Sequence, residues 1–179
     1  ILFMYNFVVK GIYNYLGVLV SDLGGGPLSV GFAYFFDSLP ELITFFLTPR
    51  LLRKYQSKDL IFASLILQTV RLILILVFSS SLAIMLLGCL SGLAYGLLAS
   101  AYKTYIYELA PEKYKVSCLS LCESIIGLSG VASAPVFGFI IINFGTFASI
   151  GMGLVINIIA ALIIVGSILK KRRETREEL

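Results

Sequence analysis

Ionisable residues stand inside stretches of the sequence that are otherwise almost wholly apolar. Three of them are basic and three are acidic: Lys10, Arg71, Lys103, Asp37, Glu41 and Glu123. If these stretches cross a membrane, each charge at mid-bilayer costs at least about 2.5–3.5 kcal/mol, so such side chains normally face the interior of a helix bundle and pair. Equal numbers of the two signs are what pairing requires, and such residues are candidates for ligand binding or proton transfer.

Position along the predicted helices indicates which of these charges can meet. At a rise of 1.5 Å per residue, Asp37, Glu41 and Arg71 share the middle of the membrane within about 6 Å. Lys10 and Glu123 share a second depth, and we expect a buried ion pair between them. The remaining lysine lies near a helix end, from which its long side chain can reach the headgroups.

Further polar residues recur with the three- and four-residue spacing that places side chains on one helix face. Three predicted helices carry such a stripe: Asn6, Lys10, Tyr13 or Asn14, and Ser21 in the first; Tyr34, Asp37, Glu41, Thr44 and Thr48 in the second; Ser64, Gln68 and Arg71 in the third. Together they predict a polar cavity. The alternative is that these groups only hold helices together. We favour this structural role for the serine and threonine residues, and a functional role in the cavity for Glu41 and Arg71.

Composition determines the elements that must position these residues. Of the 179 residues, 59% are apolar and 13% are charged, and the mean hydropathy is +0.97, whereas soluble domains carry about 25% charged residues. A membrane-crossing helix needs about 20 mostly apolar residues. The sequence therefore predicts an all-α, polytopic membrane protein, with helices at about 1–22, 28–49, 59–79, 82–109, 114–142 and 146–169 and a charged tail at 170–179.

Basic residues gather in alternate loops, which predicts the orientation in the membrane. The loop at 49–59, the loop at 109–116 and the tail are rich in lysine and arginine, and the loops at 22–27, 79–81 and 143–145 hold none. The positive-inside rule predicts that the basic loops and both chain ends lie on the cytoplasmic side of a cell membrane. The basic tail follows an apolar helix and is diluted by glutamates, so we read it as a topology anchor, not a nucleic-acid site.

The remaining motifs do not point to an enzyme or a cofactor. There is no histidine, and the three cysteines fall in apolar stretches, which does not favour a metal site. No nucleophile elbow and no phosphate-binding loop is present. Gly88, Gly92, Gly96 and Ser100 recur every four residues, a spacing that lets two helix backbones approach closely, so we predict packing for them. Pro135 is a candidate kink.

Two longer segments resemble a known family of membrane transporters. The stretches LGGGPLSVGFAYFFDSLPELITFFLTPRLLRKY and SGLAYGLLASAYKTYIYELAPEKYKVSCLSL are similar to the seventh-to-eighth helix region and to the tenth helix with its following loop in the major facilitator superfamily. Over the whole chain the resemblance is to the C-terminal six-helix half. It implies one half of a twelve-helix bundle whose solute site lies near the midplane, between the two halves.

Within that superfamily the chain looks most like the branch of lactose permease and the nucleoside–proton symporters. Glu41 in SLPEL is similar to an acid that joins substrate binding with proton coupling, and Arg71 in QTVRLIL to an arginine on the proton pathway. The His and Glu of the permease's tenth helix fall near Leu90 and Leu93 here, so its proton relay does not carry over. The permease's acidic seventh helix and basic eleventh helix appear here with the signs exchanged, as Lys10 and Glu123.

These observations predict a proton-coupled symporter of a small polar solute, a sugar or a nucleoside. Glu41 would bind the solute and the proton, Arg71 would favour the carboxylate, and Asp37 and Gln68 would bind solute hydroxyl groups, with Asn14 and Tyr34 on the same pathway. Lys10–Glu123 would be a structural or gating pair.

Three other interpretations stay open. One is a drug–proton exporter of the same superfamily, one is a non-transporting assembly factor with the same fold, and one is a six-helix homodimer. Because the chain starts at Ile1 inside an apolar run, we expect a missing N-terminal half as the partner.

Overall fold

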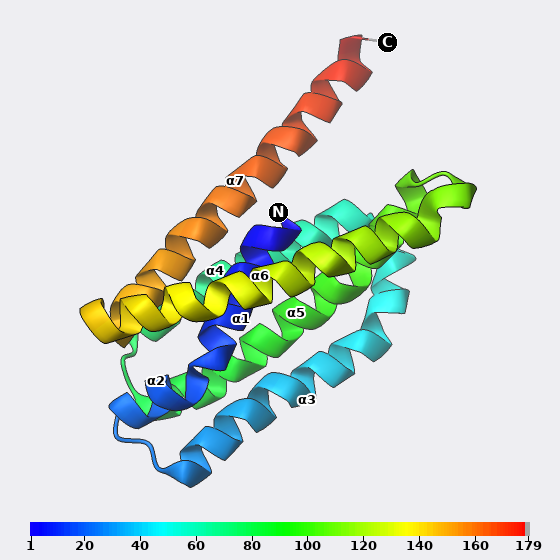
Figure 1. Cartoon of the computed structure of the whole chain (residues 1–179). Coiled ribbons are helices and arrows are strands. Elements are labelled where there is room, and N and C mark those ends of the chain that lie inside the picture. The colour runs from blue at the N-terminus through cyan, green and yellow to red at the C-terminus, as the bar shows by residue number, and fades with distance from the viewer. Residues whose placement is uncertain (178–179) are drawn as a thin grey trace.

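The computed structural model describes the backbone of residues 1–177 and the side chains of residues 1–167, and all regular secondary structure in that part of the chain is helical. The elements follow one another with short connections (Figure 1): α1 Leu2–Asn14, α2 Leu16–Asp22, α3 Pro27–Leu52, α4 Ser57–Val77, α5 Ser81–Leu109, the 3₁₀-helix η1 Glu112–Tyr114, α6 Lys115–Phe144 and α7 Thr146–Glu177. The predicted all-α class is confirmed.

Five stretches are long and apolar enough to cross a membrane: Pro27–Leu52, Ser57–Val77, Ser81–Leu109, Glu112–Phe144 and Thr146–Ser167. Helices α1 and α2 precede them and run past the other helices to the end of the bundle where α2 and α3 are connected (Figure 1). We call the opposite end, which holds the 53–56 loop and η1, the basic end, because Arg53, Lys54, Lys58 and Lys113 lie there.

The segment that contains α1 and α2 differs from the single helix predicted at 1–22. The helix is interrupted at Tyr15, whose backbone has φ −110° and ψ 13°. The Tyr15 hydroxyl donates a hydrogen bond of 2.9 Å to the carbonyl oxygen of Ala134 on α6. Gly11 and Gly17 flank the break, and glycine lowers helix propensity by about 1 kcal/mol. The interruption therefore coincides with a weak stretch of helix that a tertiary contact holds.

Two helix ends also differ from the prediction. The sequence predicts that the second helix ends at Pro49, but α3 continues through Pro40 and Pro49 to Leu52. Membrane helices tolerate internal prolines more readily than soluble helices do. The charged tail predicted at 170–179 belongs to α7 as far as Glu177, and its far end projects beyond the other helices (Figure 1). The side chains of that tail lie outside the described residues.

Close backbone contact holds α3 against α5. A Cβ atom built on Gly92 would overlap the carbonyl oxygen of Asp37 and lie 2.9 Å from the Glu41 nitrogen, and one built on Gly88 would lie 3.1 Å from the Asp37 nitrogen. Gly96 faces Thr44 in the same way. The glycine stripe predicted to serve packing does so, and it sets the distance between the helix that carries the two acids and its neighbour.

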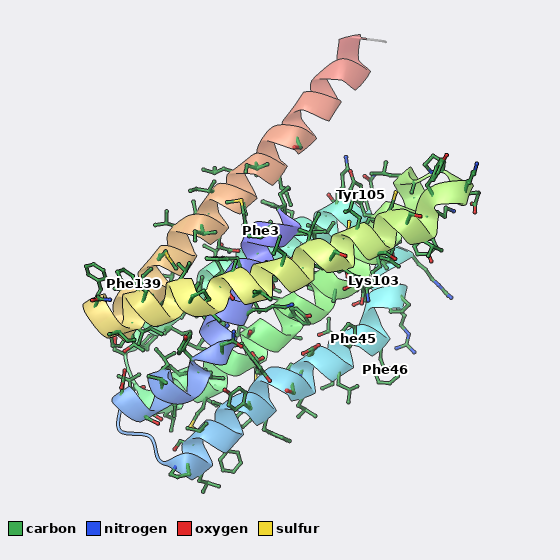
Figure 2. The ribbon with its side chains drawn as sticks, viewed as in Figure 1. Phe3, Phe45, Phe46, Lys103, Tyr105 and Phe139 are labelled. Carbon is green, nitrogen blue, oxygen red and sulfur yellow. The ribbon has the colours of Figure 1, made fainter. Side chains whose placement is uncertain are left out.

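The membrane-spanning helices are buried to different extents within the bundle. Among the crossing segments the buried share is 44% for α4 and only 17% for α3, with 28% for the segment that contains α6. Phe46 on α3 is 74% exposed and Phe139 on α6 is 63% exposed, and both side chains point away from the bundle (Figure 2). These two helices therefore present apolar faces outward.

Candidate functional site

Glu41 lies in a cavity of about 150 Å³ between four helices. Its lining comes from α1, α3, α5 and α6 and consists of Asn6, Glu41, Phe45, Tyr95, Leu98, Ala99, Tyr102, Lys103, Glu123 and Ile126. Glu41 is half-buried, and among the described side chains no cation is close enough to form an ion pair with it. The cavity thus combines a free carboxylate with aromatic, amide and charged groups, which is the chemistry that small-molecule sites use.

The opposite wall of the cavity holds a three-residue network between α5 and α6. Lys103 Nζ lies 3.4 Å from Glu123 Oε1, and the hydroxyl of Tyr102 donates a hydrogen bond to the same oxygen. The side chains of Lys103 and Glu123 are 50% and 48% exposed, so the pair is accessible. Lys103 lies in the same region of the bundle as Phe45 (Figure 2), and both line the cavity.

This network corrects the predicted partner of Glu123. We expected a buried pair with Lys10, but Glu123 bonds to α5 and is not buried. The Lys10 ammonium donates a hydrogen bond of 3.1 Å to the carbonyl oxygen of Ile126, and its alkyl stem lies against Gly130. Depth in the membrane places two residues at one level, but it does not say which helix faces which, and here α5 faces Glu123.

A second polar group lies fully inside the bundle, beside the cavity. Arg71 and Gln68 on α4 are 3% and 0% exposed, Asp37 on α3 is 8% exposed, and Tyr5 on α1 is 0% exposed. Within the described residues no ion pair involves Arg71 or Asp37. Neither Arg71 nor Gln68 lines the cavity around Glu41. Within the described residues no ion pair joins Glu41 and Arg71, and the predicted effect of Arg71 on Glu41 stays a prediction.

The structure separates the other two predicted site residues from the cavity. Asn14 is exposed at the end of α1. The hydroxyl of Tyr34 donates a hydrogen bond of 3.3 Å to the Tyr13 carbonyl oxygen, and the two rings meet edge to face at 5.0 Å. Neither residue lines the cavity around Glu41, and Tyr34 instead links α3 to α1.

Three residues at the site were not predicted from the sequence: Tyr5, Tyr95 and Tyr102. Each is a tyrosine in an apolar run, and a tyrosine gives no sign there of whether its hydroxyl lies inside the bundle or among lipid headgroups. The only usable signal was for Tyr102, which directly precedes a lysine in a long apolar helix. The sequence predicts that the Lys103 side chain reaches the membrane surface, whereas in the structure it lines the cavity.

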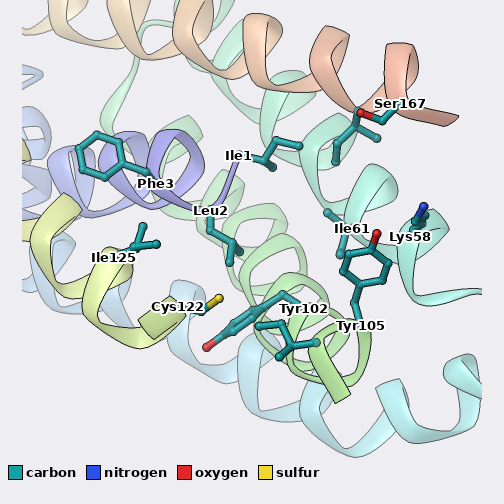
Figure 3. Close-up of a pocket in the computed structure, with 12 residues that line it drawn as sticks. Ile1, Leu2, Phe3, Lys58, Ile61, Tyr102, Tyr105, Cys122, Ile125 and Ser167 are labelled. Carbon is teal, nitrogen blue, oxygen red and sulfur yellow. The ribbon is translucent and has the colours of Figure 1, made fainter. Parts of the chain in front are cut away.

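A larger cavity of about 540 Å³ lies nearer the basic end (Figure 3). It is lined mostly by aliphatic and aromatic side chains, including Ile1, Leu2, Ile61, Ile125 and Ile164, with Lys58 as its charged residue. Tyr102 lines both cavities and stands between them. The larger cavity lacks the paired ionisable groups of the smaller one, so we assign the candidate solute site to the smaller cavity.

Comparison with known proteins agrees with this architecture. The family model described as Major Facilitator Superfamily matches residues 1–179, the whole chain. A search of curated proteins gave no match.

Proposed function

Because the chain belongs to the major facilitator superfamily of membrane transporters, we propose that it carries a small polar solute by proton-coupled symport, with a sugar or a nucleoside as the substrate class. The observation that carries this proposal is the free, half-buried Glu41 carboxylate in a cavity walled by Tyr95, Tyr102 and Asn6. A carboxylate accepts hydrogen bonds from hydroxyl groups, and an aromatic ring stacks on the apolar face of a sugar or a base.

The transport cycle follows from the charges around the cavity. Glu41 binds the solute, and the Lys103–Glu123 pair next to it carries no net charge, so a neutral solute enters without displacing a counter-ion. Tyr102, which donates to Glu123, separates this cavity from the larger one at the basic end. We assign the α5–α6 network the role of a gate on that side, which opens as the helices rock between two arrangements.

A second six-helix half would complete the solute pathway. The low buried shares of α3 and α6 support this arrangement, since they are the helices that offer the most surface for a partner. The lysine and arginine residues at the basic end favour a location of this end on the cytoplasmic side of a cell membrane. The α7 helix would then end in the cytoplasm.

The proposal is tested by transport into proteoliposomes that contain a pH-sensitive dye. Sugars and nucleosides are added in turn to vesicles that carry the intact protein, its Glu41→Gln variant, or Glu112→Gln. The control makes the same chemical change at a carboxylate that is 88% exposed, outside the cavity. We expect a solute-triggered pH change in the wild type and the control that is lost in Glu41→Gln. Solute uptake driven by pH in Glu41→Gln would refute the role of Glu41, and no response from the folded wild type would refute this substrate class.

A second candidate function is export of lipophilic cations in exchange for protons. Phe45, Tyr95 and Tyr102 surround the same carboxylate, and aromatic faces next to a carboxylate attract organic cations. The same assay separates the two, because a lipophilic cation would then trigger a pH change of the opposite sign, and sugars and nucleosides would give none.

A further inference from the structure

The larger cavity near the basic end adjoins a second, polar pocket. The larger cavity has a volume of about 540 Å³ and a mostly aliphatic and aromatic lining, with Lys58 as its charged residue. The polar pocket has a volume of about 530 Å³, and its lining includes Arg53, Lys54 and Glu108. Lys58 and Tyr105 line both spaces. The two spaces therefore form a site that is apolar on one side and polar on the other, which suits an amphiphilic ligand.

The charges in the polar pocket favour an anion. Glu108 is the acidic residue of its lining, and both oxygens of that carboxylate already accept hydrogen bonds from the Ser57 hydroxyl, at 3.0 and 3.1 Å. Among the described side chains, Arg53, Lys54 and Lys58 take part in no ion pair. The pocket thus presents three positive charges against one negative charge that has a partner.

The apolar cavity has the depth of one membrane leaflet. Helix α6 starts at Lys115, and Ile125 lines the cavity, so at 1.5 Å per residue the cavity reaches about 15 Å along that helix. Half of the hydrocarbon core of a bilayer is also about 15 Å thick. Lys58 and Tyr105 stand on one side of the cavity and Phe3 and Ile125 on the other (Figure 3). Phe3 is 37% exposed, so the cavity is open to the surroundings of the bundle.

We propose that these two spaces bind one anionic phospholipid from the leaflet at the basic end. One acyl chain would lie in the larger cavity, and the phosphate would lie beside Lys58, Arg53 and Lys54. Basic pockets between transmembrane helices bind the head groups of anionic lipids in this way. A cationic amphiphile would meet three like charges, and a small polar solute would leave the aliphatic lining without a partner.

The headgroup, and not the acyl chain, decides which lipid binds. An acyl chain has apolar neighbours in the bilayer as well as in the cavity, so its transfer gives little preference for one lipid over another. Each lysine or arginine beside an anionic headgroup strengthens binding about fivefold. Removing the charge of Lys58 is therefore expected to weaken the binding of an anionic lipid about fivefold, relative to a zwitterionic lipid with the same chains.

Tryptophan fluorescence of the intact protein in bilayers tests the proposal, because the sequence contains no tryptophan. Phe3→Trp places a reporter in the cavity lining. Leu162→Trp places one on α7, at a residue that is 64% exposed and lies outside the cavity. Each variant is reconstituted in phosphatidylcholine that contains the same small fraction of a lipid with brominated chains, either phosphatidylglycerol or phosphatidylcholine. Bromine quenches tryptophan at close range, so the quenching shows which lipid lies beside the reporter.

We expect brominated phosphatidylglycerol to quench Phe3→Trp more than brominated phosphatidylcholine does, and both lipids to quench Leu162→Trp equally. Adding Lys58→Gln should lower the preference at Phe3→Trp about fivefold. The matched control is Lys113→Gln. The ammonium groups of Lys58 and Lys113 each lie over a tyrosine ring, at 5.3 and 5.7 Å, but Lys113 lines neither space, so the preference should remain.

A second reporter, Ile125→Trp, keeps the inference falsifiable if Phe3→Trp does not fold, and the same preference is expected there. Equal quenching by the two lipids in the cavity, or a preference that Lys58→Gln leaves unchanged, would overturn the inference. A reporter that neither lipid quenches would show that protein fills the cavity, and quenching by a brominated free fatty acid alone would show a different ligand; both results would also overturn it.

The outcome is independent of the proposed function, because the experiment measures lipid binding alone. If no sugar or nucleoside is transported but the preference for phosphatidylglycerol depends on Lys58, the substrate class fails and the lipid site stands. If solute-driven pH changes occur but the lipid preference is absent, the proposed function stands and the lipid site fails.

Discussion

The contact between Gly92 and α3 offers a direct test of the packing that positions both acids. Replacing Gly92 by alanine adds one Cβ atom, which the structure places over the Asp37 carbonyl oxygen and 2.9 Å from the Glu41 nitrogen. Both neighbours are backbone atoms, so no side chain can rotate away. The two helices must separate, and the segment that carries Asp37 and Glu41 must move with α3.

The magnitude follows from two opposing effects. Adding a carbon to a closely packed contact costs about 1–3 kcal/mol, and alanine in place of glycine inside a helix returns up to about 1 kcal/mol. We therefore expect Gly92→Ala to lose about 1–2 kcal/mol of stability. The matched control is Gly31→Ala on α3, where an added Cβ meets nothing within 4 Å, so only the helix gain of up to about 1 kcal/mol remains.

Thermal unfolding of the purified protein in detergent measures this difference. The helix gain is common to both variants, so they differ by the packing cost of about 1–3 kcal/mol. For a chain of this size about 1 kcal/mol corresponds to roughly 2–4 °C, so the two midpoints should differ by about 2–12 °C, with Gly92→Ala lower. Gly88→Ala should fall between them, since its Cβ would lie 3.1–3.3 Å from its neighbours. Equal midpoints for Gly92→Ala and Gly31→Ala would refute the close approach of α3 and α5.

Two further predictions concern the outer helices and the orientation. Asn157 on α7 is fully buried and donates two hydrogen bonds to α4. Asn157→Leu should therefore lose about 1 kcal/mol of stability, seen as an unfolding midpoint roughly 2–4 °C lower, whereas Asn143→Leu, whose amide bonds only within its own helix, should not. Equal losses would show that the link to α4 contributes nothing. The orientation is tested in a variant without the three native cysteines. A cysteine that replaces Gln56 should react with a membrane-impermeant thiol reagent only in inside-out vesicles, and one that replaces Gly26 only in right-side-out vesicles. The reverse pattern would overturn the proposed orientation.

Much of the fold could be predicted because the bilayer imposes it. A chain with so few charges must form long apolar helices, and the Gly and Pro residues between them mark where those helices end. The α5 stripe was predictable for a similar reason, since glycine at every fourth position has few uses other than close helix contact. The interruption at Tyr15 was not, because it depends on a hydrogen bond to Ala134, more than a hundred residues away.

The candidate site was predictable in its residue types but not in its pairings. Membrane depth can be estimated from helix length, and it places Asp37, Glu41 and Arg71 near one level. The direction in which a residue points around its helix depends on how the helices pack, and this is why Glu123 was assigned to Lys10 when it contacts Lys103 and Tyr102. Pairing of charges therefore needs the three-dimensional arrangement.

Asp37 and Glu41 show how that arrangement gives different environments to two chemically similar residues. They are four apart on α3 and would share one face of an isolated helix. In the bundle, α5 approaches closely at Gly92, between the levels of the two acids, and its side chains become larger towards the basic end, where Tyr95 opens a cavity beside Glu41. Asp37 is buried and its backbone lies against α5, whereas Glu41 is half-buried and lines the cavity. Enlarging Gly92 would thus disturb both acids at once, because both lie on the α3 segment that it contacts.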